Sequence, residues 1–288
     1  MTAAQAQTIA AQQVDLGKYT TLKVGGPAEL WEVNSTEDLL KASQAPYRVL
    51  GAGSNLLVAD AGVPERIIKL GAAYNDIKTY SGETDVWLGA ATPVPGLIRR
   101  TAAAGLSGLE GLLGVPAVLG GAVCMNAGTR YGSMADTLQE IEVFVDGALK
   151  RLAASALNLS YRHSDLPAGA VITRVRLAFT PSSPQQVEAR LAEVDAARKG
   201  QPKVKSAGCA FKNPAGDSAG RLIDMAGLKG LRVGDAMVSH EHGNFIVNLG
   251  QASAADVTAL LALIRSKVET PLETEWELWG FENAGRDL

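Results

Sequence analysis

The glycine-rich stretch GLSGLEGLLGVPAVLGGAVCMNAG, residues 105–128, restricts the fold of this chain more than any other segment. Its uncharged run over residues 111–129 has almost the length of a membrane-spanning helix, but five glycines and Pro116 interrupt it, so a membrane span is not expected. Each glycine in regular structure costs roughly 0.5–1 kcal/mol relative to alanine, because it loses more backbone freedom on folding. We therefore interpret the stretch as backbone that lies against a large cofactor. The alternative is a tightly packed turn region.

A second glycine-rich segment, GAGSNLLV over residues 51–58, follows the strand-like sequence YRVL. It begins like the dinucleotide-binding pattern G-x-G-x-x-G, but Leu56 stands where the third glycine is needed for close packing of helix on strand. The phosphate-binding pattern G-x-x-x-x-G-K-[ST] is also missing from the sequence. What remains is a loop whose backbone amides, with the side chains of Ser54 and Asn55, can surround phosphate oxygens. An ordinary turn between two strands explains this segment about equally well.

Length and charge narrow the class of protein. A chain of 288 residues is long enough for two or three modules. The formal net charge of -3 and the absence of any run of Lys and Arg give no basic surface for nucleic acid, so we expect a small-molecule partner. The first residues, MTAAQAQTIAAQQ, lack the basic and apolar regions of a secretory signal, and we expect a cytoplasmic protein.

The few cysteines and histidines do not form a metal-binding pattern. Two cysteines in a cytoplasmic chain are expected to be free thiols. No metal is expected, because neither C-x-x-C nor H-E-x-x-H spacing occurs among Cys124, Cys209, His163, His240 and His242. We expect Cys124, within the apolar sequence AVCMNAG, to be a buried structural thiol.

The hydrophobic pattern predicts strands in the first two thirds of the chain and fewer helices. Strands are expected at RVLGAG, RIIKL, DVWLGA, IEVFVD and AVITRVRLAF, the last with apolar residues at alternate positions. Helices are expected over residues 95–105, 187–200 and 253–268, the last with Ser253 and Asp256 as a capping pair. The sequence TPSSPQQ, residues 180–186, marks a break between two domains.

Seven sequence blocks occur in the order and spacing of one known family. The blocks are GAGSNLLV, GLEGLLGVPAVLGGAVCMNAG, LSYRHSDL, SAGCAFKNP, AGRLIDMAGLKGLRVGDAMVS, NFIVN and LETEWELWG. In these blocks, from about Tyr19 to Gly280, the chain resembles the UDP-N-acetylenolpyruvoylglucosamine reductases. The resemblance implies an α+β fold, with a FAD-binding module of the vanillyl-alcohol-oxidase (PCMH-like) type followed by a C-terminal α+β substrate-binding domain.

The resemblance also implies where the domains and the cofactor lie. We expect an N-terminal extension over residues 1–18, a FAD-binding region over residues 19–182 with subdomains of about 19–72 and 73–182, and a substrate-binding domain over residues 183–288. The family's glycine blocks hold non-covalent FAD. Carried over to this sequence, the expected FAD contacts are Gly51, Gly53, Ser54, Asn55, Leu56, Gly120, Gly121, Asn126 and Gly128. The short link after Phe179 resembles the compact subtype, which lacks an extra substrate-covering loop.

Two positions depart from the family's usual sequence. This chain has NAGTRYG, one residue longer than the usual NAGAYG, so the loop beside the flavin has no template in the family pattern. The second departure is Cys209 in SAGCAFKNP, where the family commonly has the serine that donates a proton. A thiol with a reference pKa of about 8.5 is a much stronger acid than an aliphatic hydroxyl, so Cys209 is expected to fill this role.

The family's reaction defines three catalytic roles. NADPH reduces FAD, and the hydride then passes to an enolpyruvyl ether on a UDP-sugar, which leaves negative charge that must be stabilised and protonated. By the resemblance, Arg162 faces the carboxylate, Cys209 donates the proton and Glu275 is the catalytic acid. Strand alternation alone places Glu273, Glu275 and Glu277 on one face and does not single out Glu275.

Further expectations concern substrate, partners and alternatives. Lys212, Asn213 and His242 are expected to bind the substrate, and the enzyme is expected to act as a monomer on small molecules, without nucleic acid or membrane. One alternative is a flavin-dependent alcohol or sugar oxidase of the same fold. A non-catalytic nucleotide-binding regulator is the other, and the presence of Arg162, Cys209 and Glu275 together argues against it.

Overall fold

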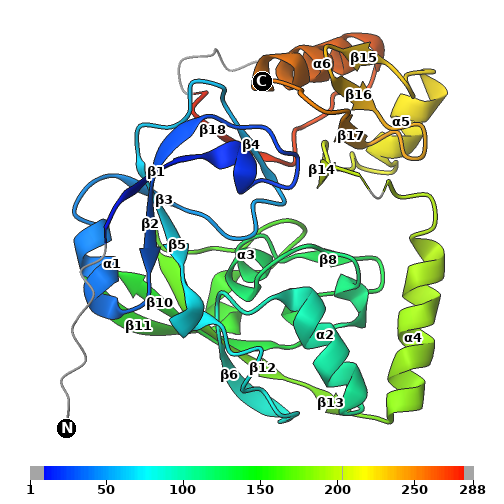
Figure 1. Ribbon diagram of the computed structural model, residues 1–288. Helices are drawn as coiled ribbons and strands as arrows, with labels where there is room; N and C mark the ends of the chain where they lie inside the picture. Colours follow the sequence, from blue (N-terminus) through cyan, green and yellow to red (C-terminus); the bar gives the residue numbers. More distant parts are fainter. Residues whose placement is uncertain (1–9, 203, 282–288) are drawn as a thin grey trace, which may run out of the picture.

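The computed structural model describes residues 10–202 and 204–281 and contains three four-stranded sheets (Figure 1). The first sheet has the order β1-β2-β5-β3, with β1 antiparallel to β2 and the other neighbours parallel. Its strands are β1 (Gln12–Asp15), β2 (Pro27–Val33), β3 (Tyr47–Val49) and β5 (Arg66–Leu70). Helix α1 (Thr36–Ala42) connects β2 to β3 and begins after Ser35, whose side chain accepts a hydrogen bond from the backbone of Asp38. Strand β1 lies before the domain start expected at residue 19.

The second sheet is antiparallel and supports the largest core. Its order is β11-β10-β12-β6. The strands are β6 (Asp85–Gly89), β10 (Leu138–Val145), β11 (Ala148–Ala153) and β12 (Val171–Ala178). The alternation expected in β12 is confirmed, because Val171, Val175 and Leu177 are fully buried while Arg174 is exposed. Helices α2 (Val94–Ala103) and α3 (Leu119–Cys124) contribute buried residues to the same core.

The third sheet, β14-β17-β16-β15, belongs to the C-terminal part of the chain and is also antiparallel. Its elements are α5 (Ala219–Met225), α6 (Ala254–Lys267), β14 (Ser206–Cys209), β15 (Arg232–Val233), β16 (Ala236–Val238) and β17 (Phe245–Asn248). The capping pair expected for α6 is confirmed: Ser253 accepts from the backbone of Asp256, and the Asp256 carboxylate accepts from the backbone of Ser253. Its predicted stripe of Val257, Leu260, Leu261 and Ile264 is buried.

Short pairings and one long helix connect these sheets. Helix α4 (Pro184–Ala197) runs along the side of the molecule, from the second sheet toward the third (Figure 1). The paired short strands are β4 (Leu56–Val58) with β18 (Glu277–Trp279), β7 (Leu106–Ser107) with β13 (Thr180–Pro181), and β8 (Gly128–Thr129) with β9 (Gly132–Ser133). The 3₁₀ turns are η1 (Leu16–Lys18), η2 (Ala72–Tyr74), η3 (Glu110–Leu112), η4 (Met134–Asp136) and η5 (Ala154–Leu157). Among the described residues, no helix has the length and apolarity to cross a bilayer.

Pairing of β4 with β18 is the connection that matters most for the site. The two strands are parallel and bring Leu56, within the glycine-rich segment of residues 51–58, opposite Glu277. Beside this pair, the backbone oxygen of Asn55 accepts a hydrogen bond from Glu277. The last strand of the chain therefore lies against a loop near its beginning, and residues of the C-terminal part line the same cavity as the glycine-rich loop.

Candidate active site

Three cavities adjoin one another, and together they are called the channel. Their volumes are about 290, 450 and 460 Å³, and consecutive cavities share lining residues. The first and second share Val49, Leu50, Gly51, Val118, Gly121 and Cys124. The second and third share Ser54, Asn55, Val115, Met125, Arg162 and Glu275. A channel of this form suits a long ligand with a second ligand at one end.

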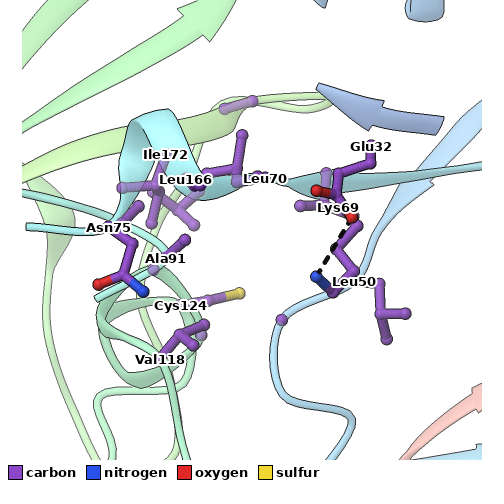
Figure 2. Close-up of a pocket in the computed structure, with 18 residues that line it drawn as sticks. Glu32, Leu50, Lys69, Leu70, Asn75, Ala91, Val118, Cys124, Leu166 and Ile172 are labelled. Carbon is purple, nitrogen blue, oxygen red and sulfur yellow. Dashed lines mark ion pairs between the residues drawn. The ribbon is translucent and has the colours of Figure 1, made fainter. Parts of the chain in front are cut away.

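The first cavity lies between the first sheet and α3 (Figure 2). Val118 and Cys124 line one side, and an ion pair of 4.0 Å between Lys69 Nζ and Glu32 Oε2 lines the other. A Cβ atom built on Gly121 would meet no atom within 4 Å, so the missing side chain leaves open space in the cavity. This open surface on α3 fits a large planar or phosphorylated ligand such as FAD.

The predicted FAD contacts are distributed over all three cavities. Gly51, Gly53, Ser54, Asn55 and Leu56 line the second cavity, Gly120 lines the first, Gly121 lines both, and Gly128 lines the third. Asn126 is not among the lining residues: it is buried, its Nδ2 donates to Ser160 O at 3.0 Å, and its Oδ1 accepts from Ala135 N at 3.0 Å.

Backbone geometry explains two of these glycines without any ligand. Gly53 has a φ of +62°, and a Cβ atom there would lie 2.3 Å from Tyr19 O. Gly128 begins the hairpin of β8 and β9, where a Cβ atom would lie 2.6 Å from that of Ser133. The extra residue in NAGTRYG therefore lies in a hairpin whose tip is Arg130 and Tyr131.

The three predicted catalytic residues lie together where the second and third cavities meet. Arg162 Nε lies 2.8 Å from Glu275 Oε1, and the same guanidinium donates from Nη1 to Gly128 O at 2.9 Å. Cys209 lines the third cavity together with Arg162 and Glu275. The Glu275 side chain is only 6% exposed, which makes it a buried acid within a cavity.

Hydrogen bonds between three backbone segments bring Cys209 beside Glu275. On one side of the central segment, Ala210 N donates to Asn244 O at 2.8 Å; on the other, Glu275 N donates to Ala210 O at 2.8 Å. Residues 209–212 therefore lie between β17 and the segment that leads to β18. The flexible polar side chains of the site are thus attached to a paired backbone rather than to a free loop.

Burial raises the pKa of both acids of the site, Cys209 and Glu275. It raises the pKa of Cys209 to about 12, and the charge of Glu275 adds to this, while Arg162 and Arg198 oppose it. Burial also raises the pKa of Glu275, against the opposing effect of Arg162. Cys209 is consequently a neutral thiol at physiological pH, able to give a proton and poorly suited to act as a nucleophile.

Only one of the three predicted substrate-binding residues lines the channel. Lys212 lines the second cavity, and its Nζ lies 2.6 Å from Glu273 Oε1. Asn213 Oδ1 accepts from Ala219 N at 3.1 Å at the start of α5. His242 is half-buried, and its Nδ1 accepts from Asn244 N at 3.1 Å. Neither Asn213 nor His242 is among the residues that line the three cavities.

One expectation about side-chain environment was wrong, and another needs a distinction. Cys124 is exposed rather than buried in the core, and Figure 2 shows its sulfur directed into the first cavity. Glu273, Glu275 and Glu277 do not share one environment, because Glu273 is 72% exposed on its side chain and Glu275 only 6%. The three carboxylates still alternate with the buried side chains of Leu272 and Trp276, as expected for residues on one face of a strand.

Arg198 lines the third cavity, although the sequence did not single it out. It follows directly after α4, and its Nη2 donates to Gly114 O at 3.2 Å. A charged residue at the end of an exposed helix gives no sequence signal of a cavity. Its place depends on the packing of α4 against η3.

Comparison with known proteins agrees with this architecture. A model of a FAD binding domain matches residues 24–152, and a model of the UDP-N-acetylenolpyruvoylglucosamine reductase C-terminal domain matches residues 201–278. Curated UDP-N-acetylenolpyruvoylglucosamine reductases of Thermus thermophilus and Deinococcus radiodurans are 60% and 51% identical. These matches cover 93% of this chain in both cases, and 98% and 95% of the relatives.

A solved structure shows the same fold over nearly the whole chain. The crystal structure of the UDP-N-acetylenolpyruvylglucosamine reductase of Thermus caldophilus superposes with a TM-score of 0.89 at 59% identity, covering 94% of this chain and 99% of that one. The expected α+β fold, with a FAD-binding module of the vanillyl-alcohol-oxidase type and a C-terminal domain, is confirmed. The chain belongs to the UDP-N-acetylenolpyruvoylglucosamine reductase family.

Proposed function

We propose that this enzyme reduces UDP-N-acetylglucosamine enolpyruvate to UDP-N-acetylmuramate with FAD as cofactor and NADPH as hydride donor, a step of peptidoglycan precursor synthesis. The observation that carries the proposal is the meeting of Arg162, Cys209 and Glu275 at one junction of the channel. FAD, when bound, accepts hydride from NADPH and supplies it to the β-carbon of the enolpyruvyl group. The glycine-lined part of the channel would hold this cofactor.

Arg162 is proposed to stabilise the charge that develops on the substrate. Addition of hydride to the β-carbon places an electron pair on the α-carbon, which the adjacent carboxylate delocalises. Arg162 meets this charge with a guanidinium that Gly128 O and Glu275 hold in place. Its φ of +57° lies in the left-handed region, a strained conformation that is often retained at functional sites.

Cys209 is proposed to complete the reduction by protonating the α-carbon. The S–H bond breaks, a C–H bond forms, and a thiolate remains that takes up a proton from solvent before the next turnover. Glu275 is proposed as the acid that hydrogen-bonds the enolate oxygen. Burial raises the pKa of Glu275, which favours the protonated, donating form.

Substrate binding and organisation complete the proposal. Lys212, Asn213 and His242 are proposed to bind the UDP-sugar. Of the three, only Lys212 lines the channel, and this position supports its proposed role. Arg198, which lines the third cavity, is added as a cation for the diphosphate. We propose a domain boundary after residue 182, and the pairing of β1 with β2 joins residues 12–18 to the first domain. We also propose that the enzyme is a cytoplasmic monomer.

A stopped-flow experiment under anaerobic conditions tests this function. The FAD-loaded enzyme is first reduced with NADPH and then mixed with UDP-N-acetylglucosamine enolpyruvate. Rapid return of the oxidised flavin spectrum is expected, with formation of UDP-N-acetylmuramate. A flavin that stays reduced with this sugar and is reoxidised rapidly by oxygen alone would identify an oxidase instead.

A further inference from the structure

The buried side chain of Asn244 holds the backbone next to Cys209. Asn244 is 2% exposed and lies directly before β17. Its Oδ1 accepts from Phe211 N at 2.9 Å, and its Nδ2 donates to Phe211 O at 2.7 Å. Its own backbone oxygen accepts from Ala210 N at 2.8 Å. Three hydrogen bonds therefore fix the two residues that follow the proposed proton donor.

The same carboxamide also reaches the Cys209 side chain. Burial and the charge of Glu275 raise the pKa of Cys209, whereas Arg162, Arg198 and, least of these, a side-chain hydrogen bond from Asn244 lower it and so favour the thiolate. An amide nitrogen has two hydrogens, so one can serve Phe211 O while the other points to sulfur. Asn244 is not among the residues that line the three cavities. It is therefore placed to affect Cys209 and not to contact a ligand in the channel.

A hydrogen-bond donor near Cys209 would stabilise the thiolate that remains after proton donation. A thiol that has released its proton leaves a thiolate in a buried place, where a charged group without a partner is strongly destabilised. An amide can donate a hydrogen bond to that thiolate and, having no acidic or basic function near neutral pH, does not compete for the proton. We propose that Asn244 is the positioning residue of the proton donor: it fixes the direction of the Cys209 sulfur and stabilises the thiolate that forms when the proton leaves. This inference rests on the donor role proposed for Cys209.

The substitution Asn244→Asp tests the inference with little change in shape. An aspartate can still accept from Phe211 N, but when ionised it can donate neither to Cys209 nor to Phe211 O, to which Asn244 Nδ2 donates at 2.7 Å. We expect kcat with the enolpyruvyl sugar to fall by about 10- to 100-fold, the usual effect of losing one hydrogen bond to a charged group. The KM for the sugar and the rate of flavin reduction by NADPH should stay near those of the wild type, because Asn244 does not line the channel.

A double-mutant cycle separates this role from a general structural one. When Cys209→Ala has already removed the thiol, adding Asn244→Asp should lower the remaining rate much less than it does in the presence of the thiol, because only the lost hydrogen bond to Phe211 O is common to both backgrounds. Equal slowing in both backgrounds would overturn the inference, because Asn244 would then act independently of Cys209. If Cys209→Ala alone turns over at the wild-type rate, the proposed donor role of Cys209 is wrong. This single variant keeps Asn244, so it tests the donor role separately from the role of Asn244.

Asn248, the last residue of β17, provides a matched control. It is also buried, its Nδ2 donates to Leu22 O at 3.0 Å, and its Oδ1 accepts from Gly250 N at 2.8 Å. These contacts lie away from Cys209. Asn248→Asp should therefore reduce stability without the selective fall in kcat. A comparable fall in kcat for Asn248→Asp would attribute the effect of Asn244→Asp to lost stability and overturn the inference.

Thiol reactivity provides a second readout that needs no turnover. In a Cys124→Ser background, Cys209 is the only thiol of the chain. Iodoacetamide should then alkylate Cys209 of the apoprotein several-fold more slowly after Asn244→Asp, because a smaller fraction is thiolate. If Asn244→Asp fails to fold, Asn244→Ser, which keeps one hydroxyl donor, takes its place in both measurements. An unchanged or increased alkylation rate would overturn the inference.

Discussion

At the scale of single residues, the site depends on how few contacts hold the Arg162 guanidinium. Two of its contacts are the carboxylate of Glu275 and the carbonyl oxygen of Gly128. The planar, forked guanidinium can meet both at once, whereas the single ammonium of a lysine is a point charge on a flexible chain. The shape of the side chain therefore matters as well as its charge.

Arg162→Lys tests this dependence on shape. We expect the transfer from reduced flavin to the enolpyruvyl sugar to slow by about 10- to 100-fold, because charge is kept but the fixed geometry is lost. Reduction of the flavin by NADPH should stay near the wild-type rate. Stopped-flow measurement of the two half-reactions checks this, and equal slowing of both would indicate a purely structural role.

Cys209→Ala tests the proposed role of Cys209 as proton donor. FAD binding and oxidation of NADPH by an artificial acceptor should be largely retained, because neither needs that proton. Turnover of the enolpyruvyl sugar should fall by about 10²- to 10⁴-fold, the usual range for loss of a positioned acid. Cys209→Ser should recover part of this loss. Steady-state assays of the two variants decide the matter, since wild-type turnover by Cys209→Ala would assign the proton to another group.

The raised pKa of Cys209 also predicts how stability depends on pH. Burial raises its pKa to about 12 in the folded protein against an ordinary value of 9.0, so the folded state holds this proton more tightly than the unfolded state. Such a group stabilises the folded state fully below the unfolded pKa, and this contribution is lost as pH rises toward the folded pKa. From about pH 8 to about pH 10, the wild type should therefore lose more free energy of unfolding than Cys209→Ala. Denaturant titrations at both pH values measure this, and parallel changes would show that the thiol ionises freely.

The site residues that the sequence identified lie in local motifs, whereas those that it missed depend on contacts with distant parts of the chain. Arg162 and Cys209 stand in distinctive local blocks, which the family resemblance located. Asn244 and Arg198 act through partners far away in the sequence, such as Phe211 and Gly114, and no local pattern encodes those partners. Their positions beside the channel and beside Cys209 therefore follow from the folded structure and not from a local sequence pattern.

At the scale of elements, hydrophobic periodicity and capping residues correctly predicted the helices and strands whose pattern lies within their own sequence. Helix α6 has its Ser253 cap and a stripe of buried residues, and β12 alternates in the expected way. The pairing of β4 with β18 was not predicted, because it joins segments about 220 positions apart and only tertiary packing selects the partner. The break at residues 180–186 contains the short strand β13, which pairs with β7.

Helix α3 provides a test in which protein stability and cofactor binding change in opposite directions. A Cβ atom at Gly121 would meet nothing within 4 Å, so Gly121→Ala should stabilise the apoprotein by about 0.5–1 kcal/mol through helix propensity. The same methyl group would occupy the channel, so FAD affinity should fall. Thermal unfolding of the apoprotein and a fluorescence titration with FAD measure the two effects.

Gly120 is the neighbouring control for that experiment. A Cβ atom there would lie 3.1 Å from that of Ala90, so Gly120→Ala should crowd the packing of α3 and gain less stability than Gly121→Ala. Unchanged FAD affinity in Gly121→Ala would show that the cofactor does not lie against this face of α3.

At the scale of the whole molecule, the channel joins parts of the chain that have separate hydrophobic cores. The second cavity is lined by Gly51 and Asn55 from the N-terminal part, Val118 from the middle, and Glu275 and Trp279 from the C-terminal part. Leu57 of β4 packs in the core of the C-terminal sheet, while Trp279 of β18 packs in the core of the N-terminal sheet. Each of these two strands therefore contributes a side chain to the core of the other part of the chain. The two parts are packed together, although two separate family models match them.

This packing predicts that FAD stabilises the molecule as one unit. A ligand that binds only the folded state adds RT ln(1 + [L]/Kd) to the free energy of unfolding, about 2.7 kcal/mol at a free concentration of 100 Kd. Because all parts contribute to the second cavity, FAD should raise the unfolding midpoint of both the N-terminal and the C-terminal part. Hydrogen exchange measured with and without FAD resolves the parts, and protection should increase in the buried strands β5 and β17 alike. Protection confined to β5 and the other N-terminal strands would mean that the C-terminal part closes over the channel only when the sugar is present.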